Sequence, residues 1–306
     1  MLDVATGFVV IGVAILIGYI IGRVDLLGPH GRHVLNRLTF FVLSPFLLFV
    51  VLSQADVQTL FSALLPVSAI AALVVIAAQA LFSRFLWHRS TAETTIAALS
   101  AGQVNSNNMG IPLSLYLLGS AAFPAPVILL QLLVFTPISM AVLDAATTGQ
   151  RSPRRILKRT ATNPIVLGSV LGVAVSLSGW ELPPLILDPA QLIANACVPV
   201  MLIGYGMSLY GQRVLGTAGH RRDVILATAL KLVAMPLVAW ATAAYVFQLP
   251  PEGILIVTVL AALPTAQNIF TYSQHYGVGE SISRDTIFLT TVGCVPVLLL
   301  IMVLLG

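Results

Sequence analysis

A long apolar run is interrupted near its middle by the stretch Gly102-Gln103-Val104-Asn105-Ser106-Asn107-Asn108-Met109-Gly110-Ile111-Pro112. This polar passage cannot face lipid, because each backbone group left without a hydrogen bond at hydrocarbon depth costs several kcal/mol. The stretch must therefore be buried in protein or line an aqueous cavity. We interpret it as the break in a discontinuous membrane helix, which we expect over residues 94–118.

A second break of this kind occurs later in the chain, as Leu263-Pro264-Thr265-Ala266-Gln267-Asn268. Pro45 and Pro199 stand in similar apolar contexts at an offset of 199 − 45 = 154 residues, and the same offset places Pro264 opposite Gly110. Corresponding breaks in the two halves of a membrane protein are typical of the binding site of a transporter.

The composition excludes a water-soluble globule. Of the 306 residues 58% are hydrophobic and 8% are charged, whereas soluble domains have roughly 45–50% and 25%. A bilayer demands about 20 apolar residues per helix. Ten runs of about this length occur, at residues 4–22, 38–53, 61–82, 94–118, 125–146, 164–179, 192–211, 224–246, 253–272 and 286–305. The first is interpreted as a retained helix, because no basic residue precedes it.

The charges of the loops predict the orientation in the membrane. Of the 15 lysines and arginines, 14 lie in alternate loops and none lies in the opposite loops. Because basic residues gather in cytoplasmic loops, both termini are expected outside the cytoplasm, in a multi-pass protein of the cell inner membrane. The basic cluster Arg151 to Arg159 is explained better as a cytoplasmic connector, residues 148–161, than as a nucleic-acid site.

The predicted fold is an all-α polytopic membrane protein with two repeats of five helices, at residues 1–147 and 162–306. Pro137 and Pro296 also match, at an offset of 296 − 137 = 159. Because five is odd, the second repeat re-enters the membrane inverted, as in many secondary transporters. Proline in membrane helices also occurs without any repeat, which is the alternative. We expect the broken helices 4 and 9 to cross.

The two breaks contain carboxamides and no acidic residue. Pro112 and Pro264 are each suited to the first turn of the half-helix that follows, so two helix N-termini would converge, each worth roughly 0.3–1 kcal/mol to an anion. Carboxamides donate readily to a carboxylate, whereas a sodium or proton antiporter would be expected to place carboxylates here. The alternative is that the amides only join helices or satisfy the broken backbone. The candidate ligands are Asn105, Asn107, Asn108, Gln267 and Asn268, with Gly110, Pro112 and Pro264 as crossover residues.

Three ionisable residues lie within or near the predicted spans. Lys231 either neutralises a substrate carboxylate or extends its side chain toward the membrane surface. Asp144 and His275, near the inner ends of their helices, are candidates for proton coupling or for simple interfacial solvation, and Asp144 could also pair with Lys231. Cys197 and Cys294 are interpreted as small core residues. No cofactor, metal site or catalytic residue is expected.

The sequence of the first break, from Asn105 to Pro112, resembles the helix 4 signature of the auxin efflux carrier family, N-T-G-x-x-G-x-P. Pro264 and Asn268, followed by Tyr276-Gly277, resemble its helix 9 signature. The resemblance spans nearly the whole chain and implies a ten-helix fold whose transport bundle moves against a scaffold, elevator-fashion. By the same resemblance Asn105, Pro112, Pro264 and Asn268 are crossover and substrate positions. Members similar to this chain move small organic acids such as malonate or malate, while plant members export auxin. Asn107 departs from the signature, which has glycine there.

We predict a secondary carrier of a small organic anion, with proton or sodium as the candidate coupling ion and a homodimer as the candidate assembly. The main alternative is a sodium-coupled symporter of larger amphipathic acids, similar to bile-acid carriers, in which half-helix carbonyls hold the sodium. An intramembrane enzyme is a third hypothesis, but the catalytic motifs of such enzymes are absent from the sequence. A sensor that does not transport is the fourth.

Overall fold

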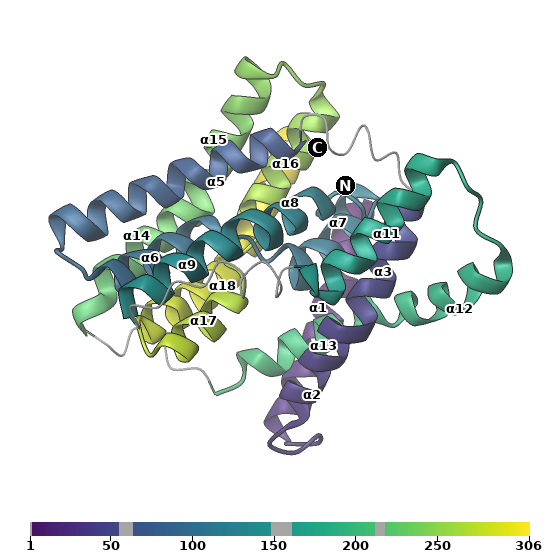
Figure 1. Ribbon diagram of the computed structural model, residues 1–306, viewed down its shortest axis with the longest axis horizontal. Helices are drawn as coiled ribbons and strands as arrows, with labels where there is room; N and C mark the ends of the chain where they lie inside the picture. Colours follow the sequence, from purple (N-terminus) through teal and green to yellow (C-terminus); the bar gives the residue numbers. More distant parts are fainter. Residues whose placement is uncertain (1, 55–63, 148–160, 212–217) are drawn as a thin grey trace. The chain divides into compact units, whose positions relative to one another are not determined.

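The computed structural model describes residues 2–54, 64–147, 161–211 and 218–306 (Figure 1). All regular structure in these ranges is helical, apart from one isolated pair of bridged residues. Six of the described helices are long and apolar enough to cross a membrane, at Gly31–Ser53, Leu64–Leu86, Ala125–Thr147, Pro184–Gly204, Arg221–Val246 and Glu280–Leu305. The predicted connector, residues 148–161, lies outside the described residues except for its last position.

The chain forms two compact units. The first contains residues 1–61, 107–129 and 158–212, and the second contains residues 62–106, 130–157 and 213–306. Each unit therefore takes segments from both predicted repeats. The boundary between the units divides the first predicted break between Ser106 and Asn107.

The first unit is built from α1 (Leu2–Arg23), α2 (Gly31–Leu38), η1 (Thr39–Leu43), α3 (Ser44–Ser53), α7 (Ile111–Leu118), α11 (Pro164–Ser178), α12 (Pro184–Asn195) and α13 (Cys197–Leu209). Glycines set its closest helix contacts. A Cβ atom at Gly18 of α1 would meet the backbone of Ile203 in α13, and one at Gly168 of α11 would meet the backbone of Pro45 in α3. In a membrane the hydrophobic effect does not drive helices together, because the lipid is itself apolar. Small residues let the helices approach closely, so that dispersion contacts stabilise their association.

The second unit is built from α5 (Leu64–Leu81), η2 (Phe82–Leu86), α6 (Thr91–Gly102), η4 (Gln131–Phe135), α9 (Thr136–Thr147), α14 (Arg221–Ala229), η6 (Leu230–Ala234), α15 (Met235–Ala241), η7 (Thr242–Val246), α16 (Pro251–Ala262), α17 (Asn268–Tyr276) and α18 (Glu280–Leu305). Buried apolar side chains from α6, α9 and α17 form one core cluster, which includes Ile96, Leu143 and Ile269. The η3 turn (Ser106–Gly110) and α8 (Ala125–Leu130) each cross the boundary between the units.

Two parts of the second unit have the same order of backbone elements. A π-helical turn, η2 or η7, is followed by a residue with positive φ and then by a twelve-residue helix, α6 or α16. The positive-φ residues are His88 at 51° and Gln248 at 49°, at an offset of 248 − 88 = 160. Positive φ is uncommon in residues other than glycine, so its recurrence at one position is informative.

Candidate functional site

Both predicted breaks are present, and their backbones pair with each other. α6 ends at Gly102 and α16 ends at Ala262, and the extended residues that follow form an antiparallel bridge between Val104 and Thr265. The Asn105 amide donates to the Pro264 carbonyl over 2.8 Å, and the Ala266 amide donates to the Gln103 carbonyl over 3.1 Å. We call this pair of extended segments, residues 103–105 and 263–267, the crossing. Pairing satisfies backbone groups that two interrupted helices would otherwise leave orphaned.

Side chains from two other helices complete the crossing. Gln131 accepts from the Val104 amide over 2.8 Å and donates to the Val104 carbonyl over 3.0 Å. The Thr265 amide donates to the Thr290 hydroxyl on α18 over 3.1 Å, and the Thr265 hydroxyl donates to the Ser100 carbonyl over 2.7 Å. Gln131 and Thr290 were not among the predicted site residues. An amide inside the apolar run 125–146 was the available signal for Gln131.

The predicted amides of the second unit lie in or beside the crossing. Asn105 is buried, and Gln267 and Asn268 are half-buried at the start of α17. The Asn268 Nδ2 atom donates to the Tyr272 hydroxyl over 3.0 Å, and that hydroxyl lies 3.2 Å from the Thr136 hydroxyl on α9. Tyr272 therefore connects Asn268 to the helix that continues from Gln131.

The remaining residues of the first break belong to the first unit. The Asn107 Nδ2 atom donates to the Ser44 hydroxyl over 3.2 Å and to the Asn108 Oδ1 atom over 3.0 Å. Gly110 precedes α7, which continues directly from η3, and Pro112 lies in the first turn of α7. Pro112 thus lies in the first α-helical turn after the break, and its role as a crossover residue stays a prediction.

The corresponding prediction for Pro264 is wrong. α17 begins at Asn268, four residues after Pro264, and Pro264 lies in the extended part of the crossing. Its carbonyl accepts from the Asn105 amide, a bond that needs no N–H from the proline. A proline is thus suited to the crossing itself as well as to a first helical turn.

Gln103 is a third residue, after Gln131 and Thr290, that was not predicted as a site residue. Its side chain is 0% exposed, and neither its Oε1 nor its Nε2 atom has a hydrogen-bond partner among the described residues. Buried side-chain amides nearly always have partners, so each exception requires an explanation. Gln103 follows α6 directly and its backbone carbonyl belongs to the crossing.

Lys231 is fully buried, so the alternative that it reaches the membrane surface is wrong. Its Nζ atom donates to the Ala261 carbonyl over 2.8 Å and to the Met235 Sδ atom over 3.0 Å. Asp144 instead accepts from the Tyr276 hydroxyl over 2.8 Å, and the pairing of Asp144 with Lys231 is not formed. His275 is exposed in the last turn of α17.

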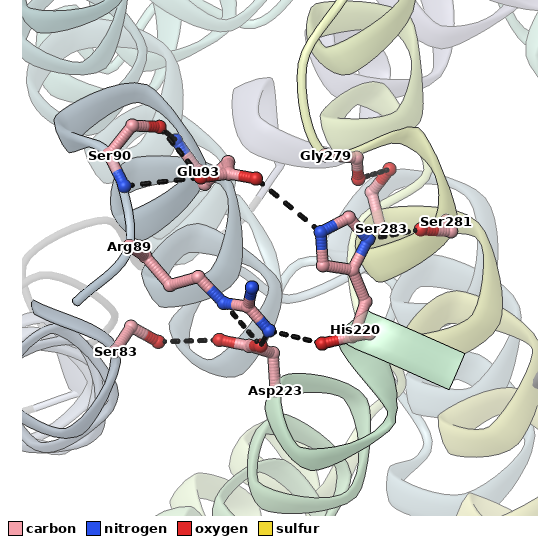
Figure 2. Close-up of polar contacts among 10 residues, drawn as sticks. Ser83, Arg89, Ser90, Glu93, His220, Asp223, Gly279, Ser281 and Ser283 are labelled. Carbon is pink, nitrogen blue, oxygen red and sulfur yellow. Dashed lines mark hydrogen bonds and ion pairs between the residues drawn. The ribbon is translucent and has the colours of Figure 1, made fainter. Parts of the chain in front are cut away.

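A buried ion pair anchors the start of α14 to the turn before α6. Asp223 is 0% exposed and accepts from the Arg89 guanidinium over 2.7 and 3.0 Å and from the Ser83 hydroxyl over 2.9 Å (Figure 2). Arg89 also donates to the Gly219 carbonyl. The carboxylate is thereby compensated by a charge and by hydrogen bonds, as a buried carboxylate requires.

Beside this ion pair, a second polar contact connects α6 to α18. Ser90 and Glu93 form a reciprocal capping box at the start of α6, and the Glu93 carboxylate lies 3.4 Å from His220 (Figure 2). His220 Nδ1 lies 2.7 Å from the Ser281 hydroxyl of α18. Burial raises the pKa of Glu93, but the hydrogen bonds from Ser90 and His220 together outweigh it, so the pKa is lower than usual. These contacts fix the end of α6 opposite the crossing.

Among the described residues no group of three or more His, Cys, Asp or Glu side chains could hold a metal ion. Within the same ranges Cys197 and Cys294 are free and buried. The chemistry at the crossing is therefore that of carboxamides, hydroxyls, backbone groups and one ammonium.

Comparison with known proteins connects this geometry to transport. The family described as "Membrane transport protein" matches residues 4–302. A Rhizobium meliloti protein named "Putative malonate transporter" is 27% identical over 285 residues, which cover 90% of this chain and 88% of that protein. The rice protein "Probable auxin efflux carrier component 5b" is 28% identical over 159 residues, 50% of this chain and 42% of its own. "Uncharacterized transporter YfdV" of Escherichia coli is 24% identical over 294 residues, 92% of this chain and 91% of its own. This chain is therefore a multi-pass membrane transporter, not an enzyme, and it belongs to the membrane transport protein family, that of the auxin efflux carriers.

Proposed function

We propose that the chain is a secondary carrier of a small organic anion, which binds at the crossing in the second unit. The observation that carries the proposal is the pairing of two broken helices around Val104 and Thr265. Broken helices that meet inside a membrane protein form the substrate sites of many transporters. The similarity to a protein named as a malonate transporter supports a carboxylate as the substrate.

The groups around the crossing suit an anion. Asn105, Gln267 and Asn268 are neutral amides, and α17 begins at Asn268, so the positive end of its dipole lies beside them. Gln103 contributes a buried carboxamide whose polar atoms have no partner within the described ranges. A carboxylate supplies acceptors to such donors, and amide oxygens do not repel it as acidic residues would. Asn107, Asn108, Gly110 and Pro112 stay predictions as site residues.

We also propose the finer membrane architecture: ten spans in two inverted repeats, with both termini outside the cytoplasm. The recurrence of a π-turn, a positive-φ residue and a twelve-residue helix at an offset of 160 supports a repeat. The antiparallel direction of the bridge supports inversion. Labelling of single cysteines placed in the basic and the non-basic loops, from each side of the membrane, tests this topology.

The proposed mechanism is the elevator-type alternating access that the family resemblance implies. A crossing that belongs to one compact unit supports a site carried by a single moving body. Asp144 and His275 stay candidates for coupling. The test is accessibility of a cysteine introduced at Gln267: it should react from both sides of the membrane in a transporting protein, and reaction from one side only under all conditions contradicts the mechanism.

The function is tested by counterflow in proteoliposomes with radiolabelled malonate, malate, acetate and indole-3-acetate. We expect one of these acids to exchange. Asn105→Ala and Asn268→Ala should abolish exchange without loss of folded protein, while Asn36→Ala, an exposed asparagine on α2, should not. No exchange of any acid, or full exchange by both crossing variants, refutes the proposal. Exchange that requires sodium and favours larger amphipathic acids would support the symporter instead.

A further inference from the structure

We propose that the Lys231 ammonium is a built-in cation of the crossing, which occupies the end of α16 where a coupling sodium ion would otherwise bind. The inference rests on the proposed function and deepens it. It assigns the charge that balances the substrate carboxylate, and it predicts anion transport without sodium. The structural basis is the bond from Lys231 to the Ala261 carbonyl, in the last turn of α16 and three residues before Pro264.

The end of a broken helix attracts a cation. The last carbonyls of a helix have no intrahelical partner and carry the negative end of its dipole. In transporters with discontinuous helices, these carbonyls coordinate the coupling cation. At the end of α16 the Ala261 carbonyl receives the Nζ atom of Lys231 instead, at 2.8 Å.

The two halves of the crossing show that capping alone does not require a charge. Ala261 and Ser100 both lie in the last turn of a broken helix, one residue before the end of α16 and two residues before the end of α6. The Ser100 carbonyl, near the end of α6, is capped by the neutral hydroxyl of Thr265 at 2.7 Å. A hydroxyl therefore suffices at the end of one of the two broken helices. The ammonium at the other introduces a charge that the backbone does not need.

That charge has no carboxylate partner within the described part of the chain. The carboxylates in the ion pairs of this unit are Asp223, Glu93 and Asp285, and their basic partners are Arg89, His220 and Arg284. An ammonium has three N–H donors, and Lys231 directs them at one carbonyl and one thioether, the latter a weak acceptor. A buried charge without an ionic partner is costly. A bound organic anion would remove that cost.

The chemistry of the ligand follows. One ammonium balances one carboxylate, and the unpaired Gln103 carboxamide with the start of α17 offers polar groups to a second polar end. The site thus suits a small acid that has a carboxylate and a second acceptor group. A neutral analogue of the same shape would leave Lys231 uncompensated and should bind poorly.

The experiment measures malonate exchange by purified full-length protein in proteoliposomes, in sodium buffer and in N-methyl-D-glucamine buffer. We expect the wild-type KM for malonate to be the same in the two buffers. Lys231→Met keeps the length and apolar stem of the side chain, and it should raise KM roughly ten- to a hundredfold, the equivalent of one lost charge-assisted hydrogen bond. Lys231→Arg should recover part of the affinity. In Lys231→Ala, sodium should bind at the vacated Ala261 carbonyl and lower KM relative to the N-methyl-D-glucamine buffer.

The outcomes separate the inference from the proposed function. If the wild type exchanges no organic acid, the proposed function fails. If exchange occurs but the wild type needs sodium, or if Lys231→Met changes only the maximal rate with KM unaltered, the built-in cation is refuted and the carrier function stands. Where Lys231→Met fails to fold, Lys231→Arg and Lys231→Ala are judged by the same KM comparison. Retention of wild-type KM by Lys231→Ala in both buffers also refutes the inference.

Discussion

Two buried glutamines beside the crossing should respond in opposite ways to the same substitution. Gln103 has neither polar atom bonded within the described residues, whereas Gln131 holds both the amide and the carbonyl of Val104. We predict that Gln103→Leu stabilises the protein without ligand and weakens anion binding. We predict that Gln131→Leu destabilises it.

The magnitudes follow from the hydrogen bonds. A buried amide without a partner costs about 1–3 kcal/mol on the scale of protein mutations, and Gln103→Leu removes this cost without stranding another group. Gln131→Leu leaves the buried Val104 amide without its partner, while the Val104 carbonyl keeps its bond from the Ser106 amide. The stranded amide costs about 1–3 kcal/mol and the lost second bond about 0.5–1.5 kcal/mol, so the loss is roughly 1.5–4.5 kcal/mol.

The assay is chemical unfolding of the purified variants in detergent micelles, followed by calorimetric titration with malonate. Gln103→Leu should raise the unfolding midpoint and reduce the affinity about tenfold or more, as expected when one hydrogen bond to a charged ligand is lost. A Gln103→Leu protein that is less stable than wild type, with unaltered affinity, would refute the reasoning, because the amide would then have a structural role. Equal changes in the unfolding midpoint for Gln103→Leu and Gln131→Leu would also refute it.

Three further predictions concern helix packing and the ion pairs. Gly18→Val should prevent folding of the first unit or lower its midpoint strongly, because its Cβ atom meets backbone, whereas Gly12→Val, with nothing within 4 Å, should be nearly neutral in the same melting experiment. Asp223→Ala should cost about 3–5 kcal/mol in chemical unfolding, since it leaves the partly buried Arg89 guanidinium without its carboxylate, and a loss below 1 kcal/mol would contradict this. The pKa of Glu93 is lowered in the folded protein, so its ionised form stabilises the fold at any pH above the unfolded-state pKa, about 4.3. This stabilisation disappears as the pH falls through the pKa of Glu93 in the folded state. Glu93→Gln should therefore flatten the loss of stability between about pH 5 and 3, and an unchanged pH profile would show that Glu93 contributes nothing there.

The broken helices were predictable because composition left few physical solutions. Amides, glycine and proline at hydrocarbon depth are tolerated only where other protein groups satisfy the backbone. The composition of the stretch around Asn105 therefore predicted a break in the helix there. The place of Pro264 was not predictable by the same reasoning. Proline fits a first helical turn and a backbone position that needs no donor equally well, and the pairing with Asn105 decided between them.

Side-chain partners could not be read from the chain. Gln103 and Gln131 are the same residue type in similar apolar surroundings, and only the packing of η4 against the crossing gives one of them its partners. Lys231 was open to two readings because its bond to Ala261 joins positions 30 residues apart on different helices. Local patterns determine where helices break, while tertiary contacts determine which polar groups are satisfied.

The crossing also bears on whether its amides have a purely structural role. Its backbone groups bond to one another and to the side chains of Gln131 and Thr290. The Gln103 carboxamide takes no part in those bonds, and the Asn268 Nδ2 atom donates to a tyrosine hydroxyl and not to the backbone of the crossing. If the amides had a purely structural role, they would bond to the backbone groups that the two helix breaks leave unpaired. Because other groups meet that need, the Gln103 carboxamide remains for a ligand, and the free energy that anchors the crossing is separate from the free energy that Gln103 contributes to binding.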